Sequence, residues 1–401
     1  MSWELTTLGE YYDVRDGTHD SPKYVREGYP LVTSKNLKGG KINLEKVKFI
    51  SKEDYLNISK RSRVDVGDVL MAMIGTIGNP VEIVQTPEFA IKNVALFKTD
   101  KHQSAAYLKY FLSSPDTKNK MLADAKGATQ KFVGLGYLRS FPIKVPPLPV
   151  QKQIVEKLDA AFVDIDKAIS TTEKNIENAE TLFSKTLNKT LEDNLSKEFL
   201  LGELCEVITK GTTPTSVGHK FTDEGINFIK IESIANQGNF LPEKMAHIDE
   251  ECHESLKRSQ LAPGDILFSI AGALGRTAIV TDDIVPANTN QALAIIRLKK
   301  HLNINKDYLR YVLNSNLTIN QSDSLKAGVA QQNLSLSQLK TYKINIPSAP
   351  IQNDIVKKID LIKEQTNALI ECYQNKFIQY ESLKSSILNQ AFSGELTKNA
   401  A

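Results

Sequence analysis

The chain has 401 residues, of which 41% are hydrophobic and 24% charged, and its formal net charge is +3. This length allows two or three domains with their own cores, while the nearly balanced charge neither indicates nor excludes nucleic-acid binding. No apolar run approaches the ~18 residues of a membrane span, the start lacks a signal-peptide pattern, and the three cysteines are far apart, so we expect a cytoplasmic protein with reduced thiols.

Two long parts of the chain repeat one another. The segment Tyr107-Leu-Lys-Tyr-Phe-Leu-Ser-Ser returns as Tyr308-Leu-Arg-Tyr-Val-Leu-Asn-Ser, at an offset of 308 − 107 = 201. Segments that begin at Gly127 and Gly328 share this offset. Because solenoid repeats have periods of about 20–50 residues, we interpret this one as a duplicated module. A duplicated module predicts two similar sites and a target that also has two halves.

Residues 1–145 predict a mixed, strand-rich domain. Val66-Gly-Asp-Val-Leu-Met-Ala-Met-Ile and Ala90-Ile-Lys-Asn-Val-Ala-Leu-Phe contain short apolar runs that are typical of strands. Gly75 and Gly78 interrupt the first region, and we interpret them as tight-turn glycines. This part of the chain therefore predicts an α+β fold.

Residues 146–195 predict a first long helix after the segment Val145-Pro-Pro-Leu-Pro. Apolar residues recur there at alternating spacings of four and three, which is a heptad seam. The seam comprises Leu158, Phe162, Ile165, Ile169, Thr172, Ile176, Ala179 and Phe183. A helix of about 40–45 residues would be roughly 60–68 Å long.

Residues 196–346 repeat the pattern of the first domain. Pro263-Gly-Asp-Ile-Leu-Phe-Ser-Ile matches the first Gly-Asp segment, and the glycines at 272 and 275 match those at 75 and 78. The matching segments Leu8-Gly-Glu and Leu201-Gly-Glu are offset by 201 − 8 = 193. The offset therefore changes from 193 to 201 along the module, and the two halves differ by short insertions in their front parts.

Residues 347–401 predict a second long helix. Its predicted seam comprises Ile355, Ile359, Ile362, Thr366, Leu369, Tyr373, a polar step at Lys376, Tyr380, Leu383 and Ile387. An amphipathic helix this long needs a partner, and we expect the two helices to form an antiparallel coiled coil that relates the domains by a pseudo-two-fold axis. Apolar residues outside the seam would be free to meet partner helices; these are Leu182, Leu187, Ile378 and Leu388.

Motifs for catalysis and cofactors are missing from the sequence. There is no phosphate-binding loop, and Gly134-Leu-Gly lacks the third glycine of a dinucleotide fingerprint. His247, Cys252 and His253 are the only grouped candidate ligands, and no matching pair stands nearby, so we predict no metal site. The sequence therefore predicts a recognition component rather than an enzyme.

Four segments together resemble the specificity subunits of type I restriction-modification systems, the HsdS family. They are Pro147-Leu-Pro-Val-Gln-Lys-Gln-Ile-Val-Glu-Lys-Leu-Asp, Asp16-Gly-Thr-His-Asp-Ser-Pro, Lys210-Gly-Thr-Thr-Pro-Thr and Ala391-Phe-Ser-Gly-Glu-Leu. The second hinge, Ile346-Pro-Ser-Ala-Pro-Ile-Gln, lacks the usual leucine after its prolines but keeps Pro350 and Gln352. The resemblance covers essentially the whole chain.

This resemblance implies a function as well as an architecture. Residues 1–145 and 196–346 would be two target-recognition domains that each read half of a bipartite, asymmetric sequence of double-stranded DNA. Residues 146–195 and 347–401 would be spacer helices on which two methyltransferase subunits dock. The chain itself would bind no cofactor. S-adenosylmethionine, ATP and Mg would belong to the methyltransferase and to the restriction and translocation subunits.

Candidate DNA contacts lie in polar loops, because Asn and Gln suit adenine, Arg and Lys suit guanine, and lysines and hydroxyls suit phosphates. In the first domain they are Thr18, His19, Asp20, Ser21, Thr33, Ser34, Lys35, Asn36, Lys92, Asn93, Thr129, Gln130 and Lys131. In the second domain they are Lys210, Thr212, Thr213, Thr215, Lys230, Glu232, Arg276, Asn290, Gln291, Gln331, Gln332 and Asn333. Each could instead serve a turn or a cap.

Two other functions fit the sequence less closely. A coiled-coil scaffold or decoy would hold methyltransferase partners without reading DNA. An unrecognised hydrolase or ligase would need a set of nucleophile, base and acid that the sequence does not display.

Overall fold

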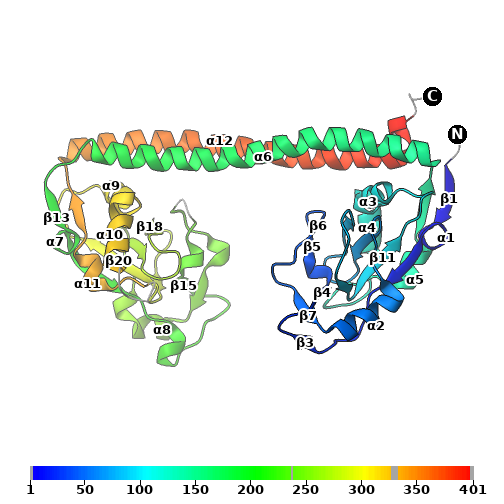
Figure 1. The fold of residues 1–401 in the computed structure, drawn as a ribbon. Helices are drawn as coiled ribbons and strands as arrows, with labels where there is room; N and C mark the ends of the chain where they lie inside the picture. Colours follow the sequence, from blue (N-terminus) through cyan, green and yellow to red (C-terminus); the bar gives the residue numbers. More distant parts are fainter. Residues whose placement is uncertain (1–2, 236–237, 327–332, 398–401) are drawn as a thin grey trace. The chain divides into compact units, whose positions relative to one another are not determined.

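The computed structural model describes residues 3–235, 238–326 and 333–397. It divides into two compact units: unit 1 contains residues 1–173 and 374–401, and unit 2 contains residues 174–373 (Figure 1). Each unit has one mixed domain and part of both long helices, α6 (Leu148–Glu192) and α12 (Ala349–Ser393). No helix in these described ranges is long and apolar enough to cross a membrane.

The domain of unit 1 combines a central antiparallel sheet with short helices. Its elements are β1 (Glu4–Thr7), α1 (Leu8–Tyr11), β2 (Asp13–Asp16), β3 (Tyr24–Val25), β4 (Tyr29–Val32), η1 (Ser34–Asn36), β5 (Leu37–Lys38), β6 (Lys41–Ile42), β7 (Lys48–Ile50), α2 (Lys52–Ser62), β8 (Val69–Ala72), β9 (Gly78–Glu82), β10 (Ala90–Ile91), β11 (Val94–Lys98), α3 (Ala105–Ser113), α4 (Pro115–Ala123), α5 (Leu135–Ser140) and β12 (Pro142–Val145). The central sheet has the strand order β2-β11-β8-β9, and a second sheet has the order β10-β4-β7-β3.

The domain of unit 2 repeats this plan. Its elements are β13 (Glu198–Leu200), α7 (Leu201–Leu204), β14 (Cys205–Lys210), η2 (Pro214–Val217), β15 (Ile226–Ile229), η3 (Ile231–Ser233), η4 (Pro242–Lys244), β16 (Ala246–Ile248), α8 (Glu250–Ser255), η5 (Lys257–Ser259), β17 (Ile266–Ser269), β18 (Thr277–Ile279), β19 (Ala287–Thr289), β20 (Leu293–Leu298), α9 (Lys306–Leu313), α10 (Asn316–Lys326), α11 (Leu336–Lys340) and β21 (Lys343–Asn345); a last turn, η6 (Glu395–Thr397), follows α12 in unit 1. The central sheet, β14-β20-β17-β18, corresponds strand by strand to that of unit 1.

The inner strands β8 and β17 of the central sheets are buried on both faces, which explains why they are short apolar runs. Successive side chains of a strand point to opposite faces. In β8, Met71 therefore packs with Tyr107 of α3, while Leu70 packs on the other face. In β17, Phe268 and Leu267 divide in the same way between two core clusters.

A Gly-Asp turn begins the central strand of each domain. Gly67 and Gly264 have φ values of +92° and +87°, which favour glycine. The buried Asp68 pairs with Lys98 at 2.7 Å, and Asp265 pairs with Arg297 at 2.7 Å. Burial raises the pKa of Asp68, whereas the hydrogen bonds that Arg297 donates to Asp265 raise the pKa of Arg297. The turn that the repeat revealed therefore has a structural role in both domains.

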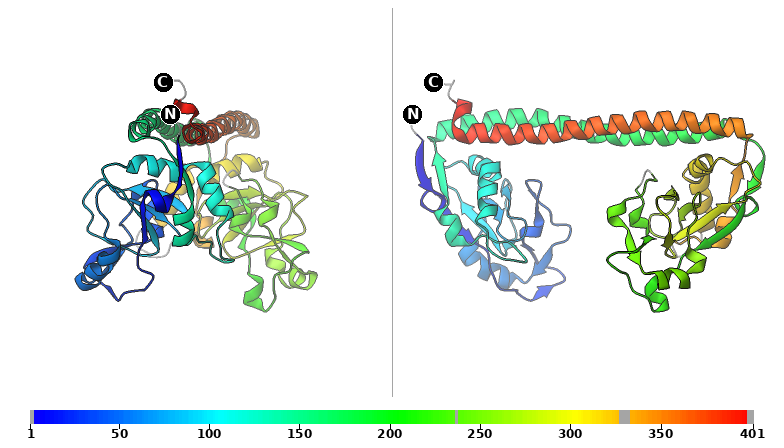
Figure 2. Two further views of the ribbon diagram at one scale, coloured as in Figure 1. Left: turned by 90° about the vertical axis from the view of Figure 1, so that its right-hand side faces the viewer. Right: turned by 180° about the vertical axis from the view of Figure 1, so that it is seen from behind.

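In unit 1, the first part of α6 and the last part of α12 lie side by side and run in opposite directions (Figure 2). Lys384 Nζ donates to Asp166 at 2.7 Å, and Lys157 Nζ donates to the carbonyl of Leu396 at 2.9 Å. The predicted seam residues Leu158, Phe162 and Ile165 are buried there.

Part of the predicted seam of α12 is wrong. Leu369 and Leu383 are 44% and 46% exposed. The residues that directly follow the predicted seam positions 369, 376 and 383 are more buried; they are Ile370, Phe377 and Lys384. The predicted seam was therefore assigned one residue too early in this part of the helix, which is why it included the polar residue Lys376.

The prediction for residues outside the seam is half right. Leu182 and Ile378 are 66% and 60% exposed, as expected for residues free to meet a partner. Leu187 and Leu388 are buried at 5% and 7% exposure, because each packs into the core of its own unit. These two leucines are therefore not free for a partner helix.

Candidate functional site

Three of the predicted loops in unit 1 meet at one end of the central sheet. The backbone N–H of Gly17 donates to Val94 O at 3.0 Å, and that of Thr18 donates to Ile91 O at 3.0 Å. Lys92 N donates to Val32 O at 2.9 Å. These bonds join the segments at 18–21, 33–36 and 92–93, which are far apart in the sequence.

The fourth predicted loop reaches the same end of the sheet. Met73 follows the last residue of β8, which is paired with Val94 of β11. Its carbonyl accepts from Val133 N at 3.0 Å, and Gly75 N donates to Lys131 O at 2.9 Å. The side chains of Thr129, Gln130 and Lys131 are all exposed beside this edge. We name the four joined loops the loop edge of unit 1.

A close backbone approach explains the glycine in the first loop. A Cβ at Gly17 would lie 2.2 Å from Ile91 O, and one at Gly211 in unit 2 would lie 1.8 Å from Thr289 O. Neither contact is sterically possible without backbone movement. Glycine is therefore required at both positions, where this loop crosses the end of the sheet.

The side chain of His19 is held in place by a polar network. Its Nε2 donates to Asp16 Oδ2 at 2.9 Å, and its Nδ1 lies 2.8 Å from Asn93 Oδ1. Asp16 is 3% exposed and also accepts a hydrogen bond from Arg61. The side chain of His19 remains 62% exposed, so it can meet a ligand in a defined orientation.

Other predicted residues of unit 1 already have partners within the loops. Asn36 is 7% exposed; its Oδ1 accepts from Thr33 N at 2.9 Å, and its Nδ2 donates to Asn43 O at 3.0 Å. Ser34 Oγ donates to Asn93 O at 3.3 Å. Lys92 donates to the hydroxyl of Ser21, while Lys35 and Asp20 are exposed. Asn36 therefore shapes its turn and is not part of the exposed set.

Unit 2 builds a corresponding loop edge. Gly211 N donates to Asn290 O at 3.1 Å, and Thr212 N donates to Thr289 O at 3.1 Å. Ile270 N donates to Ala292 O at 2.9 Å, and Ile270 O accepts from Leu334 N at 2.9 Å. These contacts join the segments at 210–215, 270–276, 290–291 and 333–334.

Two more predicted segments of unit 2 adjoin this edge. β15 pairs with β19 in parallel, so Lys230 and Glu232 follow the end of β15 beside the loop at 290. Arg276 Nη1 donates to the carbonyls of Ile231 and Ile234 at 3.1 and 2.8 Å and is half-buried. Thr215 and Asn333 are exposed. Gln331 and Gln332 lie outside the described residues.

The sequence did not reveal two arginines that support these loops. Arg61 bonds to Asp16 beside the first loop, and Arg258 Nη2 donates to Thr212 Oγ1 at 3.2 Å in the second domain. Each lies six residues before the glycine of a Gly-Asp turn (67 − 61 = 6 and 264 − 258 = 6). That constant spacing within the repeat could have identified both residues.

One group of potential metal ligands occurs in unit 2. Candidate ligand atoms of His219, Asp249 and Cys252 lie within 4.8 Å of one another. Asp249 Oδ1 caps helix α8 by accepting from Cys252 N at 2.8 Å, and His219 Nε2 lies 3.1 Å from Ser255 Oγ. His253, which the sequence grouped with Cys252, instead contacts Asn288 at 2.5 Å. Helix capping accounts for the position of Asp249 near Cys252.

Chemically, both loop edges suit a polar, extended ligand. They present hydroxyl, amide, imidazole and cationic groups, which hydrogen-bond phosphates and base edges. The last residue of β2 is the carboxylate Asp16, whereas that of β14 is the exposed amine Lys210. The two edges therefore share a backbone frame and differ in their side chains.

Comparison with known families gives a match over almost all of the chain. A model described as "Type I restriction modification DNA specificity domain" matches residues 2–179 and again 194–379. The chain belongs to this family. The two matches of the specificity-domain model also confirm the internal repeat and the resemblance to HsdS subunits.

Individual relatives of this specificity subunit are distant in sequence. It is 25% identical to the EcoBI specificity subunit of Escherichia coli over 351 residues, which cover 81% of this chain and 73% of that protein. It is 24% identical to the putative MjaX specificity subunit of Methanocaldococcus jannaschii, with 98% and 93% of the two chains covered.

Solved structures share the fold. A chain from a study of complex assembly and conformational transition of the type I R-M system matches with a TM-score of 0.73 and 20% identity, over 98% of both chains. The HsdS subunit from Thermoanaerobacter tengcongensis matches with a TM-score of 0.50 and 20% identity, over 98% and 97% of the chains.

Proposed function

We propose that this specificity subunit reads a bipartite, asymmetric DNA sequence, with one half-site at the loop edge of each unit. The observation that carries the proposal is that one duplicated frame builds the same loop edge twice with different side chains. Asp16 and His19 in unit 1 correspond in place to Lys210 and Thr213 in unit 2. Different donors and acceptors at equivalent positions select different bases, so the half-sites differ in sequence.

The long helices supply the separation between the half-sites. In our proposal α6 and α12 pair along their length as an antiparallel coiled coil, with a pseudo-two-fold axis between the domains. Each has 45 residues and would be about 68 Å long at 1.5 Å per residue. The antiparallel contacts of Lys384 with Asp166 in unit 1 support this arrangement. Such a rod sets a fixed spacing, and half-sites on one face of DNA recur about every 34 Å.

Two methyltransferase subunits would dock on the exposed faces of the helices. Leu182 and Leu383 are equivalent in the repeat (383 − 182 = 201), and they are 66% and 46% exposed. Equivalent apolar residues on two helices suit two copies of one partner. The chain itself would bind no cofactor and catalyse no reaction, while the partner subunits would bind S-adenosylmethionine, ATP and Mg.

Reconstitution with a methyltransferase subunit tests this function. The complex should select a split, non-palindromic sequence from a pool of random duplexes, and adenine methylation should map to that sequence. Exchanging residues 18–21 of unit 1 for another loop should change only one half-site. A complex that assembles but shows no sequence preference would support the scaffold function and contradict DNA reading.

A further inference from the structure

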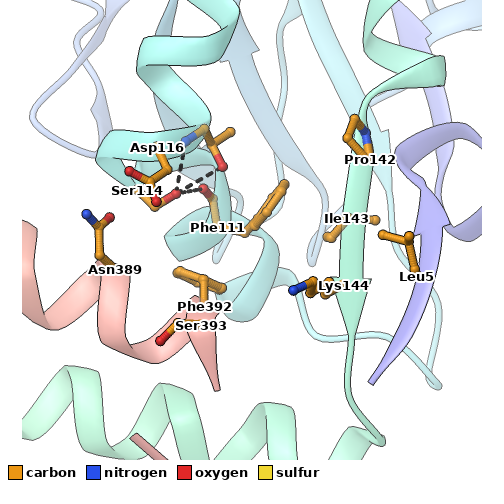
Figure 3. A pocket seen from close by; sticks show the side chains of 11 residues that line it. Leu5, Phe111, Ser114, Asp116, Pro142, Ile143, Lys144, Asn389, Phe392 and Ser393 are labelled. Carbon is orange, nitrogen blue, oxygen red and sulfur yellow. Dashed lines mark hydrogen bonds between the residues drawn. The ribbon is translucent and has the colours of Figure 1, made fainter. Parts of the chain in front are cut away.

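A pocket of about 440 Å³ lies in unit 1 between β12, the start of α4 and the end of α12 (Figure 3). Phe111 and Phe392 form an apolar wall, and Leu5 and Ile143 lie across from them. Asn389 of α12 also lines the pocket, which we name the Asn389 pocket. Its volume falls in the range of ligand-binding pockets, roughly 300–1,000 Å³.

A buried side-chain oxygen that lines this pocket has no hydrogen-bond partner. Asn389 Oδ1 is buried and unpaired. By contrast, Ser114 Oγ donates to Phe111 O at 2.8 Å, and Lys144 O accepts from the hydroxyl of Tyr107 at 2.8 Å. A buried acceptor without a donor is unfavourable, and native proteins satisfy most such groups with protein, water or a ligand.

Unit 2 shows what this acceptor binds when a donor is present. Asn188 is the equivalent of Asn389 (389 − 188 = 201), and its Oδ1 accepts from Asn316 N, the first residue of α10, at 2.7 Å. The residue equivalent to Asn316 is Pro115 (316 − 115 = 201), the first residue of α4. Proline has no backbone N–H, so unit 1 cannot make this bond.

A second difference leaves the edge of β12 open. In unit 2, Gln321 Oε1 accepts from Lys343 N at 2.8 Å, and its Nε2 donates to Lys343 O at 3.1 Å. The equivalents in unit 1 are Lys120 and Pro142. Lys120 Nζ lies 5.7 Å from the ring centre of Phe141 and does not fill the pocket.

The strand register directs two backbone groups, Pro142 O and Lys144 N, to this edge, whereas Lys144 O accepts from Tyr107. Leu8 N donates to Phe141 O at 2.9 Å, so the alternating pattern directs the backbone groups of Pro142 and Lys144 away from β1. The pocket therefore combines an apolar wall, an unpaired acceptor and an open strand edge. An extended polypeptide segment supplies the matching groups, which are an apolar side chain and a backbone N–H.

We propose that the Asn389 pocket binds an extended segment of a methyltransferase subunit, which donates a backbone N–H to Asn389 Oδ1 and places an apolar side chain against Phe111 and Phe392. This proposal rests on the proposed function, in which that subunit docks on this chain. The charges of Lys144 and Asp116 at the pocket offset each other, so it offers no excess positive charge to a nucleic acid. Because unit 2 fills the equivalent place with its own residues, two identical subunits would meet unlike surfaces.

Two variants of the full chain test the pocket by filling it or removing its acceptor. Pro115→Asn with Lys120→Gln installs the residues of unit 2 and should supply the missing donor internally. Asn389→Leu removes the unpaired acceptor. In titration calorimetry with a purified methyltransferase subunit, both should weaken binding of one of the two copies about tenfold. Both should retain or raise the Tm, because neither leaves a new buried group unpaired.

Asn188→Leu is the matched control in unit 2. It removes the partner of Asn316 N and should lower the Tm by about 2–6 °C without weakening the copy that uses the Asn389 pocket. The position of the bound segment can be mapped with a photo-crosslinking residue at Ser393, which lines the pocket, or at Glu192, its equivalent in unit 2. Only the residue at 393 should crosslink to the methyltransferase subunit.

The outcomes separate this proposal from the function on which it rests. If the unchanged chain does not bind the methyltransferase subunit, the proposed function fails and the pocket proposal fails with it. If the subunit binds the unchanged chain and both pocket variants equally well, the pocket proposal alone is overturned. Crosslinking at 393 to a second copy of this chain would also overturn it.

Discussion

The domains of unit 1 and unit 2 share a backbone frame but differ at the loop edge. In unit 1 two residues, Lys92 and Asn93, connect β10 to β11, whereas three residues connect β19 to β20 in unit 2. The Gly-Asp turns, by contrast, both keep an ion pair from the buried aspartate to a basic residue, Lys98 or Arg297, with a shortest distance of 2.7 Å in each unit. Buried contacts restrict change in the frame, while loops at the surface tolerate insertions and new side chains. This division suits the proposed reading of two different half-sites.

The largest effect should come from breaking the shared frame at the loop edge. Gly211→Ala places a Cβ 1.8 Å from Thr289 O, so the backbone must move. We expect a loss of about 3 kcal/mol or more in the free energy of unfolding and loss of recognition at one half-site. Urea unfolding and half-site selection measure the two effects. Gly136→Ala is the control, because an added Cβ there meets no atom within 4 Å; equal stability of the two variants would contradict the close approach.

Unfolding at alkaline pH should compare the buried tyrosines in the cores of the two units. Burial raises the pKa of Tyr308 to about 12, and its hydroxyl donates to Asn345 O at 2.8 Å. Between pH 10 and 12 the unfolded chain loses this proton while the folded chain keeps it, so stability falls as pH rises. The loss should approach 2–3 kcal/mol at pH 12 for this group.

Tyr308→Phe should reduce that pH dependence, although it removes a hydrogen bond worth about 1 kcal/mol at neutral pH. Tyr107 is its equivalent, and burial also raises its pKa, so Tyr107→Phe should act in the same direction. Urea unfolding at pH 8 and pH 11.5 measures both. Identical pH slopes in the variant and the unchanged chain would exclude a role for these hydroxyl groups.

Alanine substitutions at the loop edges should weaken the recognition of one half-site at a time. Asp16→Ala removes the group that orients His19, so recognition of one half-site should relax by about 1–2 kcal/mol, or roughly five- to thirtyfold. Arg258→Ala, which removes the support of Thr212, should affect the other half-site. Selection from random duplexes with the reconstituted complex distinguishes the two. A uniform loss at both half-sites would contradict separate reading by the two units.

The smallest effect should come from an exposed lysine at the loop edge. Lys131→Ala should weaken binding to all duplexes alike, because exposed lysines contact phosphates more often than base edges. The slope of log affinity against log salt should decrease by about 0.9 for one lost phosphate contact. A base-specific effect would show instead that Lys131 reads sequence.

Sequence patterns predicted the large elements better than the local ones. The two 45-residue helices lie where the heptad pattern indicated them, because neither contains a glycine or an internal proline beyond its first turn. The seam of α12 was misread near Leu369, since apolar residues occur on more than one face of that helix. A simple spacing rule cannot decide which of them a partner buries.

The candidate loops show the same limit. Polar composition identified segments that do meet at the ends of the sheets, but it could not separate the buried Asn36 from the exposed Lys35. It also missed Arg61 and Arg258, because residues that support a loop lie elsewhere in the sequence. Hydrogen bonds between distant segments decide these roles.

The sequence by itself determined the duplication, the long helices and the family, since these depend on patterns along one chain. Only the tertiary structure decided which loops share an edge, which leucines stay exposed, and that Pro115 leaves Asn389 without a donor. The physical reason is that burial and hydrogen bonding are properties of neighbours in space. The same Asn at equivalent places in the repeat is paired in one unit and unpaired in the other, because one distant backbone N–H is missing.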